Sequence, residues 1–64
     1  MKLTHAEKFR RYVYVQGETL EFTNIVAVDV TKSGFHKLTD KRGQKFIVAP
    51  GWRYIQIDTP EWSF

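Results

Sequence analysis

The chain contains no cysteine, and this absence removes two of the usual stabilisers of a very small protein. A chain of 64 residues buries only about 60% of the surface that its unfolded form exposes, so its core is small. Proteins of this size often depend on disulfides or on a structural metal. Here a disulfide and a cysteine-based zinc site are excluded, and His5 and His36 are too far apart in the sequence for a paired ligand motif. We therefore expect no metal and no other cofactor.

Long hydrophobic runs are also missing. The longest wholly apolar stretch is Ile25-Val26-Ala27-Val28, whereas a membrane-spanning helix needs about 20 apolar residues. The segment after Leu3 is polar and does not have the pattern of a signal peptide. We expect no membrane association. A chain without cysteine suits a reducing compartment, so we predict a cytoplasmic location.

The motifs of the common enzyme classes are absent as well. The four glycines, at positions 17, 34, 43 and 51, form no phosphate-binding loop. Ser33 lies in a turn-like Lys-Ser-Gly sequence, and neither serine lies in a nucleophile-elbow pattern. The carboxylates are spread along the chain, and a chain this short has little room for a deep pocket. We expect no enzymatic activity and no catalytic residues.

Aromatic residues are abundant, at 16% of the chain. Most lie in short runs that alternate with a period of two, such as Tyr12-Val13-Tyr14-Val15 and Arg53-Tyr54-Ile55-Gln56-Ile57. This period is that of a β-strand. A buried ring removes about 150–250 Å² from water, so a few rings can build a core in a small domain.

Turn-forming residues divide the chain into six predicted strands, over residues 11–16, 19–23, 25–31, 35–39, 44–49 and 53–58. The clearest turn is Asp40-Lys41-Arg42-Gly43, in which Gly43 is free to adopt a positive φ. Before the first strand, Thr4-His5-Ala6-Glu7 matches a helix capping box and predicts a short helix over about residues 5–10. We expect the rings of Trp62 and Phe64 to fold back onto the body.

These elements predict an all-β protein with a single domain over residues 1–64. We favour a small SH3-like barrel of five to six short antiparallel strands with a short N-terminal helix, because closure removes exposed strand edges. A partly open oligonucleotide-binding barrel and an open sheet covered by the helix are the alternatives. The predicted core contains Phe9, Val13, Val15, Leu20, Phe22, Val26, Val28, Val30, Leu38, Phe46, Val48, Ile55 and Ile57.

The charge balance is mildly basic, with a formal net charge of +3, and permits a polyanionic partner. If Val13 and Val15 face the core, Tyr12 and Tyr14 face solvent beside two arginines. The alternation leaves open whether these tyrosines instead pack under the helix or the C-terminal tail. The same reasoning for the last strand exposes Tyr54. A second basic group lies at a hairpin tip and is joined by Lys32 and Lys37: Lys41, Arg42 and Lys45. The candidate binding residues are Arg10, Arg11, Tyr12, Tyr14, Lys41, Arg42, Lys45, Trp52, Arg53 and Tyr54.

Rings on a strand surface can stack on bases while nearby cations hold phosphates. We therefore predict a non-enzymatic module that binds nucleic acid, either DNA or RNA. The alternative is a protein-interaction module, a regulator or inhibitor of the kind that bacteriophages and mobile elements encode, which would use the same aromatic patch. A homodimer that shares a sheet edge is compatible with both. Acidic residues can segregate from the basic hairpins and give the molecule two different sides: Glu18, Glu21, Asp58 and Glu61.

Overall fold

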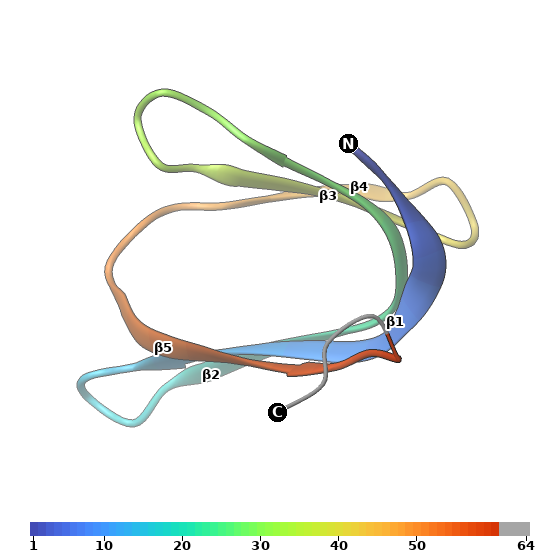
Figure 1. Cartoon of the computed structure of the whole chain (residues 1–64). Coiled ribbons are helices and arrows are strands. Elements are labelled where there is room, and N and C mark those ends of the chain that lie inside the picture. Colours follow the sequence, from blue (N-terminus) through green and yellow to red (C-terminus); the bar gives the residue numbers. More distant parts are fainter. Residues whose placement is uncertain (61–64) are drawn as a thin grey trace.

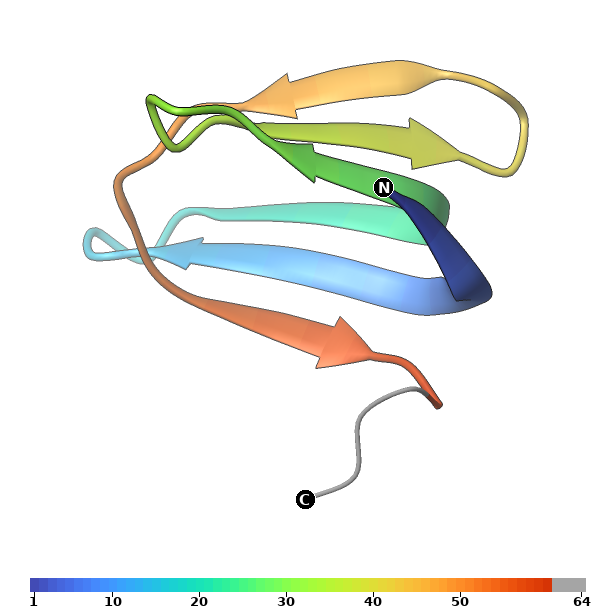
Figure 2. The same cartoon turned by 45° about the horizontal axis from the view of Figure 1, so that its top comes forward.

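The alternating runs form five antiparallel strands in the computed structural model, which describes residues 1–60. The strands are β1 (Lys2–Tyr14), β2 (Thr19–Val30), β3 (His36–Asp40), β4 (Lys45–Val48) and β5 (Trp52–Asp58). They make one sheet in the order β4-β3-β2-β1-β5, shown in Figure 2. Each of the first three strands pairs with the next along the chain, and β5 returns to pair with β1. The predicted all-β class is confirmed.

The sheet is strongly bent, so that β3 and β4 face β1 and β5 across the interior (Figure 1). The long strand β2 passes through the bend at Asn24, which has a φ of 55° and accepts a hydrogen bond of 2.8 Å from the amide of Lys41. Across Asn24 the alternation of faces slips, since Ile25 is fully buried and Thr23, two residues away, is exposed. The predicted break between two strands at Asn24 is instead a kink within one long strand.

The predicted N-terminal helix is wrong. Residues 5–10 belong to β1, which pairs with β2 from Lys2 opposite Ala27 to Val13 opposite Thr19. A helix of one or two turns has little stability of its own. As a strand, the same segment gains ladder hydrogen bonds and places buried side chains against the core. Tertiary contacts therefore override the local capping pattern.

Closure of the predicted barrel is not detected. Within residues 1–60, β4 and β5 do not pair with each other, so the sheet is open and each of these strands keeps one unpaired edge. Side chains from the two halves of the sheet meet in the interior instead. The Tyr12 ring of β1 lies 5.6 Å from His36 of β3 and 5.0 Å from Trp52 of β5, measured between ring centres. The bend is thus filled with aromatic side chains from opposite strands.

The core is centred on four buried side chains, Tyr12, Ile25, Leu38 and Val48. Partly buried side chains surround them: Leu3, Tyr14, Phe22, Val28, Phe46, Trp52 and Ile55. Six of the predicted core residues therefore lie in or against the core. Leu20, Val15 and Val30 are exposed, and their predicted burial is wrong. The expected docking of Trp62 and Phe64 falls outside the described residues.

Candidate functional site

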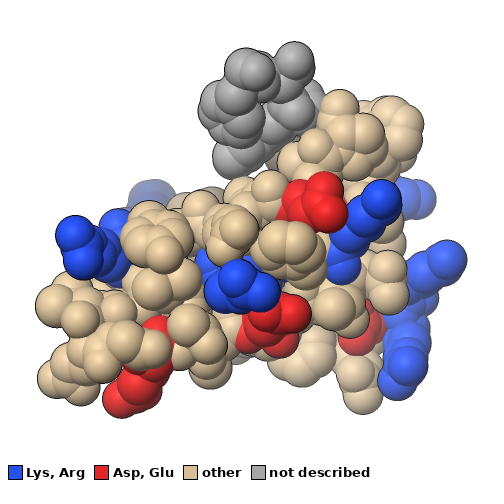
Figure 3. All heavy atoms as spheres, turned by 90° about the horizontal axis from the view of Figure 1, so that it is seen from below, with Lys and Arg blue, Asp and Glu red and all other residues tan. Residues whose placement is uncertain are grey.

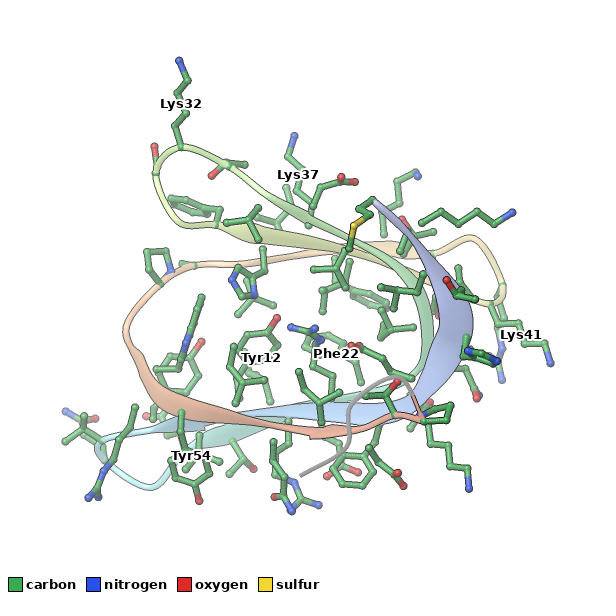
Figure 4. The ribbon with its side chains drawn as sticks, viewed as in Figure 1. Tyr12, Phe22, Lys32, Lys37, Lys41 and Tyr54 are labelled. Atoms are coloured by element: carbon green, nitrogen blue, oxygen red, sulfur yellow. The ribbon has the colours of Figure 1, made fainter. Side chains whose placement is uncertain are left out.

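The two faces of β1 are the reverse of those predicted. Tyr12 has no exposed surface, Arg10 is 6% exposed and Tyr14 packs against the core. In Figure 4 Tyr12 points into the space enclosed by the bent sheet, as does Phe22. These findings contradict the prediction that Arg10, Tyr12 and Tyr14 form an exposed binding surface. Trp52, also predicted for that surface, is half-buried against Tyr12.

A chain of polar groups runs through the interior. The Nε and Nη2 atoms of Arg10 donate to the two carboxylate oxygens of Glu7 at 2.8 and 2.9 Å. The Nη1 atom of Arg10 donates to the Tyr12 hydroxyl at 3.2 Å, and this hydroxyl lies 2.8 Å from Nδ1 of His36. Every buried side-chain nitrogen and oxygen among residues 1–60 has a hydrogen-bond partner. The network thus links β1 to β3 without an unsatisfied group.

The surroundings set the charge of each group in this network. Burial by itself would lower the pKa of Arg10, but hydrogen bonds with Glu7 and Tyr12 outweigh it and raise that pKa. Burial raises the pKa of Tyr12. Burial and then the positive charge of Arg10 lower the pKa of His36. Tyr12 therefore stays a hydroxyl, and a neutral His36 with its proton on Nε2 can accept a hydrogen bond from it at Nδ1.

The network was not predicted from the sequence. Glu7 and Arg10 are three residues apart, and residues at that spacing lie on opposite faces of a regular strand. They share the interior because the alternation slips in β1 at the bend, as it does at Asn24 in β2. No local sequence signal marks this slip.

The outward side of β1, β2 and β5 carries mixed charge. Arg11 donates to Glu21 at 2.8 Å and to Gln56 at 3.0 Å, in one row across three strands. Tyr54 is 52% exposed and pairs with Val13, so the orientation predicted for β5 is confirmed. We name this surface, with Arg11, Val13, Glu21, Tyr54 and Gln56, the tyrosine face. Figure 3 shows acidic and basic side chains interspersed on it.

The outward side of β2, β3 and β4 differs in composition. Strand register places two rows of side chains across it: Lys2, Ala27, Thr39 and Lys45 in one, and Asp29, Lys37 and Ile47 in the next. Cations of the two neighbouring turns extend this surface at its ends, and Lys32, Lys37 and Lys41 project outward in Figure 4. We name this set the lysine face: Lys2, Lys32, Lys37, Lys41, Arg42 and Lys45.

Charge is segregated between the two halves of the sheet. The half with the lysine face has six cations and two acids, Asp29 and Asp40, a net of four positive charges. Asp29 binds the N-terminal ammonium, whose hydrogen bond lowers the pKa of that carboxyl. Asp40 accepts hydrogen bonds of 2.9 Å from the backbone amides of Arg42 and Gln44. In the other half, four cations balance four acids among residues 1–60: Lys8, Arg10, Arg11 and Arg53 against Glu7, Glu18, Glu21 and Asp58. The seventh acid of the chain, Glu61, falls outside the described residues.

A groove of about 380 Å³ opens between the middle of β2 and the β3–β4 turn, and Lys41 and Arg42 of the lysine face line it. Its apolar lining is Phe22 and Phe46, whose ring centres lie 4.9 Å apart. Its polar lining is Glu21, Thr23, Asn24, Asp40, Lys41, Arg42 and Gln44. The groove therefore combines rings, amides and two cations.

The ten predicted binding residues do not form one surface. Lys41, Arg42 and Lys45 belong to the lysine face, whereas Arg11 and Tyr54 lie on the tyrosine face and Arg53 is exposed on β5. The remaining four are interior or half-buried. Sequence reasoning grouped Lys32 and Lys37 with these three cations of the lysine face but missed Lys2, because only the strand register places it on the same surface.

No group of three or more His, Asp or Glu side chains in the described part of the chain could hold a metal ion. The described residues include no helix of the length and hydropathy needed to cross a membrane. Comparison with protein-family models, with curated proteins and with solved structures gives no match for this chain.

Proposed function

We propose that this protein is a non-enzymatic module that binds nucleic acid mainly through phosphate contacts of the lysine face. The observation that carries the proposal is the segregation of charge, which leaves four uncompensated positive charges on one half of the sheet. Lysine and arginine side chains that neutralise phosphates release condensed counterions, and this release dominates non-specific nucleic-acid binding. Such binding is sensitive to salt and weakly selective for sequence.

The arrangement of the cations supports this proposal. Lys37 and Lys45 are diagonal neighbours on adjacent strands, and this geometry places their Cα atoms about 7–8 Å apart. Lys2 lies three strands from Lys45, on the order of 14 Å away. Within residues 1–60, none of the six cations of the lysine face forms a salt bridge. Their charges are free to meet phosphates.

The test is fluorescence anisotropy with a labelled single strand of about 20 nucleotides, at about 50 and 200 mM salt. In a Lys37→Gln/Lys45→Gln variant we expect weaker binding and a salt slope reduced by about 1.4, because two fewer phosphates are neutralised and each contributes about 0.7 on a single strand. The matched control is Lys8→Gln/Arg53→Gln, which removes the same charge from exposed positions outside the lysine face. Equal effects of the two variants, or no binding of wild type at the lower salt, would refute the proposal.

A protein-interaction module is the second candidate, and the tyrosine face is the observation in its favour. Exposed tyrosine near arginine is typical of the centre of a protein interface. A second copy of this chain is one partner that would suit this face. Sedimentation at increasing concentration tests it: association that Tyr54→Glu abolishes would support this candidate, and a monomer at every concentration would exclude self-association.

We further propose that the bent sheet is related to an SH3-like barrel that is open between β4 and β5. The meander of five strands, the return of β5 to β1 and the interior filled from both halves support this relation. A crystal structure in which β4 and β5 pair would support this relation. A crystal structure in which the edges of β4 and β5 are widely separated would refute it.

A further inference from the structure

We infer that the groove beside the β3–β4 turn receives an unpaired base of a single strand, while Lys41 and Arg42 of the lysine face hold the neighbouring phosphates. This inference rests on the proposed function and adds the class of nucleic acid to it. Its basis is the composition of the groove's lining, which includes two cations of the lysine face, Lys41 and Arg42.

The groove has the size and the apolar surface that a base requires. A volume of about 380 Å³ lies near the lower end of the range for small-molecule sites. Phe22 and Phe46 are half-buried and line it together, so their rings are reachable from the groove. Aromatic side chains stack on any base, because every base has a π-face.

Polar groups of the lining suit the edge of a base. Gln44 and Asn24 are exposed and carry side-chain amides, each with donors and an acceptor. The positive φ of Asn24 is tolerated by asparagine and brings the middle of β2 against the β3–β4 turn, where its carbonyl binds the Lys41 amide. The same kink that bends the sheet thus forms one wall of the groove.

The charges around the groove are compatible with a nucleotide. Lys41 and Arg42 line the groove and also belong to the lysine face, so a phosphate next to the base would meet cations. Both carboxylates of the lining are already engaged. Asp40 accepts two amides of its own turn, and Glu21 pairs with Arg11 at 2.7 Å.

Single strands and duplexes differ in what they can offer this groove. Bases of a duplex are stacked and paired, so none can enter without being flipped out. Bases of a single strand are available to stack on protein side chains. The groove therefore favours single-stranded over double-stranded nucleic acid, whereas the lysine face by itself would favour the higher charge density of a duplex.

The experiment compares three labelled probes of equal phosphate number at about 50 mM salt: an oligothymidine, an abasic oligomer with the same sugar-phosphate backbone, and a hairpin duplex. We expect the oligothymidine to bind about tenfold more tightly than the abasic oligomer, the scale of one stacked base. Equal affinities for the two single strands would overturn the inference and leave phosphate binding by the lysine face in place. Binding of none of the three would overturn both.

Two variants locate the stacked base. Phe46→Leu keeps an apolar side chain and removes a ring from the groove, and should reduce the tenfold preference to about twofold or less. Phe35→Leu is the matched control, because Phe35 is 36% exposed and does not line the groove. Circular dichroism verifies that each variant is folded. If the Phe46→Leu variant is unfolded, Gln44→Ala replaces it, because Gln44 is exposed and lines the groove. A preference that survives in every folded groove variant would place the base elsewhere and overturn the inference.

Discussion

The buried pair of Glu7 and Arg10 allows the interior network to be tested by one substitution. Their side chains are 5% and 7% exposed, and hydrogen bonds of 2.8 and 2.9 Å join them. Glu7→Gln keeps the shape of the side chain and removes its charge, which leaves a buried guanidinium without a counterion. Breaking a buried pair in this way costs about 3–5 kcal/mol. We expect a decrease of that size in the free energy of unfolding.

This decrease is large relative to the whole protein. At about 0.05–0.15 kcal/mol per residue, a chain of 64 residues has a free energy of unfolding of about 3–10 kcal/mol. Glu7→Gln should therefore be close to unfolded at 25 °C or have a greatly reduced urea midpoint. Urea unfolding followed by circular dichroism measures the difference, with the slope against urea verifying two-state behaviour.

The chain supplies its own control, since Arg11 and Glu21 form a similar pair on the outside. Their side chains are 36% and 46% exposed at a separation of 2.7 Å, so solvent screens the pair. Glu21→Gln should reduce the free energy of unfolding by less than about 1 kcal/mol. Decreases of equal size from Glu7→Gln and Glu21→Gln would refute the reasoning. A Glu7→Leu/Arg10→Met variant removes both buried charges and should be more stable than Glu7→Gln.

Two further predictions concern His36 and Asn24. The folded protein lowers the pKa of His36, so the unfolded chain binds its proton more readily and stability falls as the pH decreases through about 6.5. Urea midpoints between about pH 7 and 5 should show this decrease in wild type and a smaller one in His36→Gln; equal slopes would contradict it. Asn24 has a φ of 55°, so Asn24→Ala should reduce stability by about 1 kcal/mol and Asn24→Gly by only a few tenths. Equal melting temperatures for these two variants would show that the kink is not strained.

The interior of this protein illustrates why the predicted site was partly wrong. Tyr12, Val13, Tyr14 and Val15 are apolar on both faces of the strand, so a period of two indicates a strand but not its buried side. Pairing settles the choice: Tyr12 lies between Leu20 and Ile55 on the concave side, where His36 meets its hydroxyl. In β5 the two faces differ in polarity, because Ile55 lies on one face and Tyr54 and Gln56 on the other. The orientation predicted for β5 is confirmed.

By itself, the sequence determined the all-β class, the positions of the turns and the net charge. Alternation has a local cause in backbone geometry, and the glycine of the β3–β4 turn, Gly43, adopts the positive φ that was expected. Only the tertiary structure decided which face of β1 is buried, where the sheet bends and which cations lie together. The register aligns Lys2, Lys37 and Lys45 from distant segments, and the kink at Asn24 forms both the bend and the groove. These features depend on interactions between strands that no local pattern encodes.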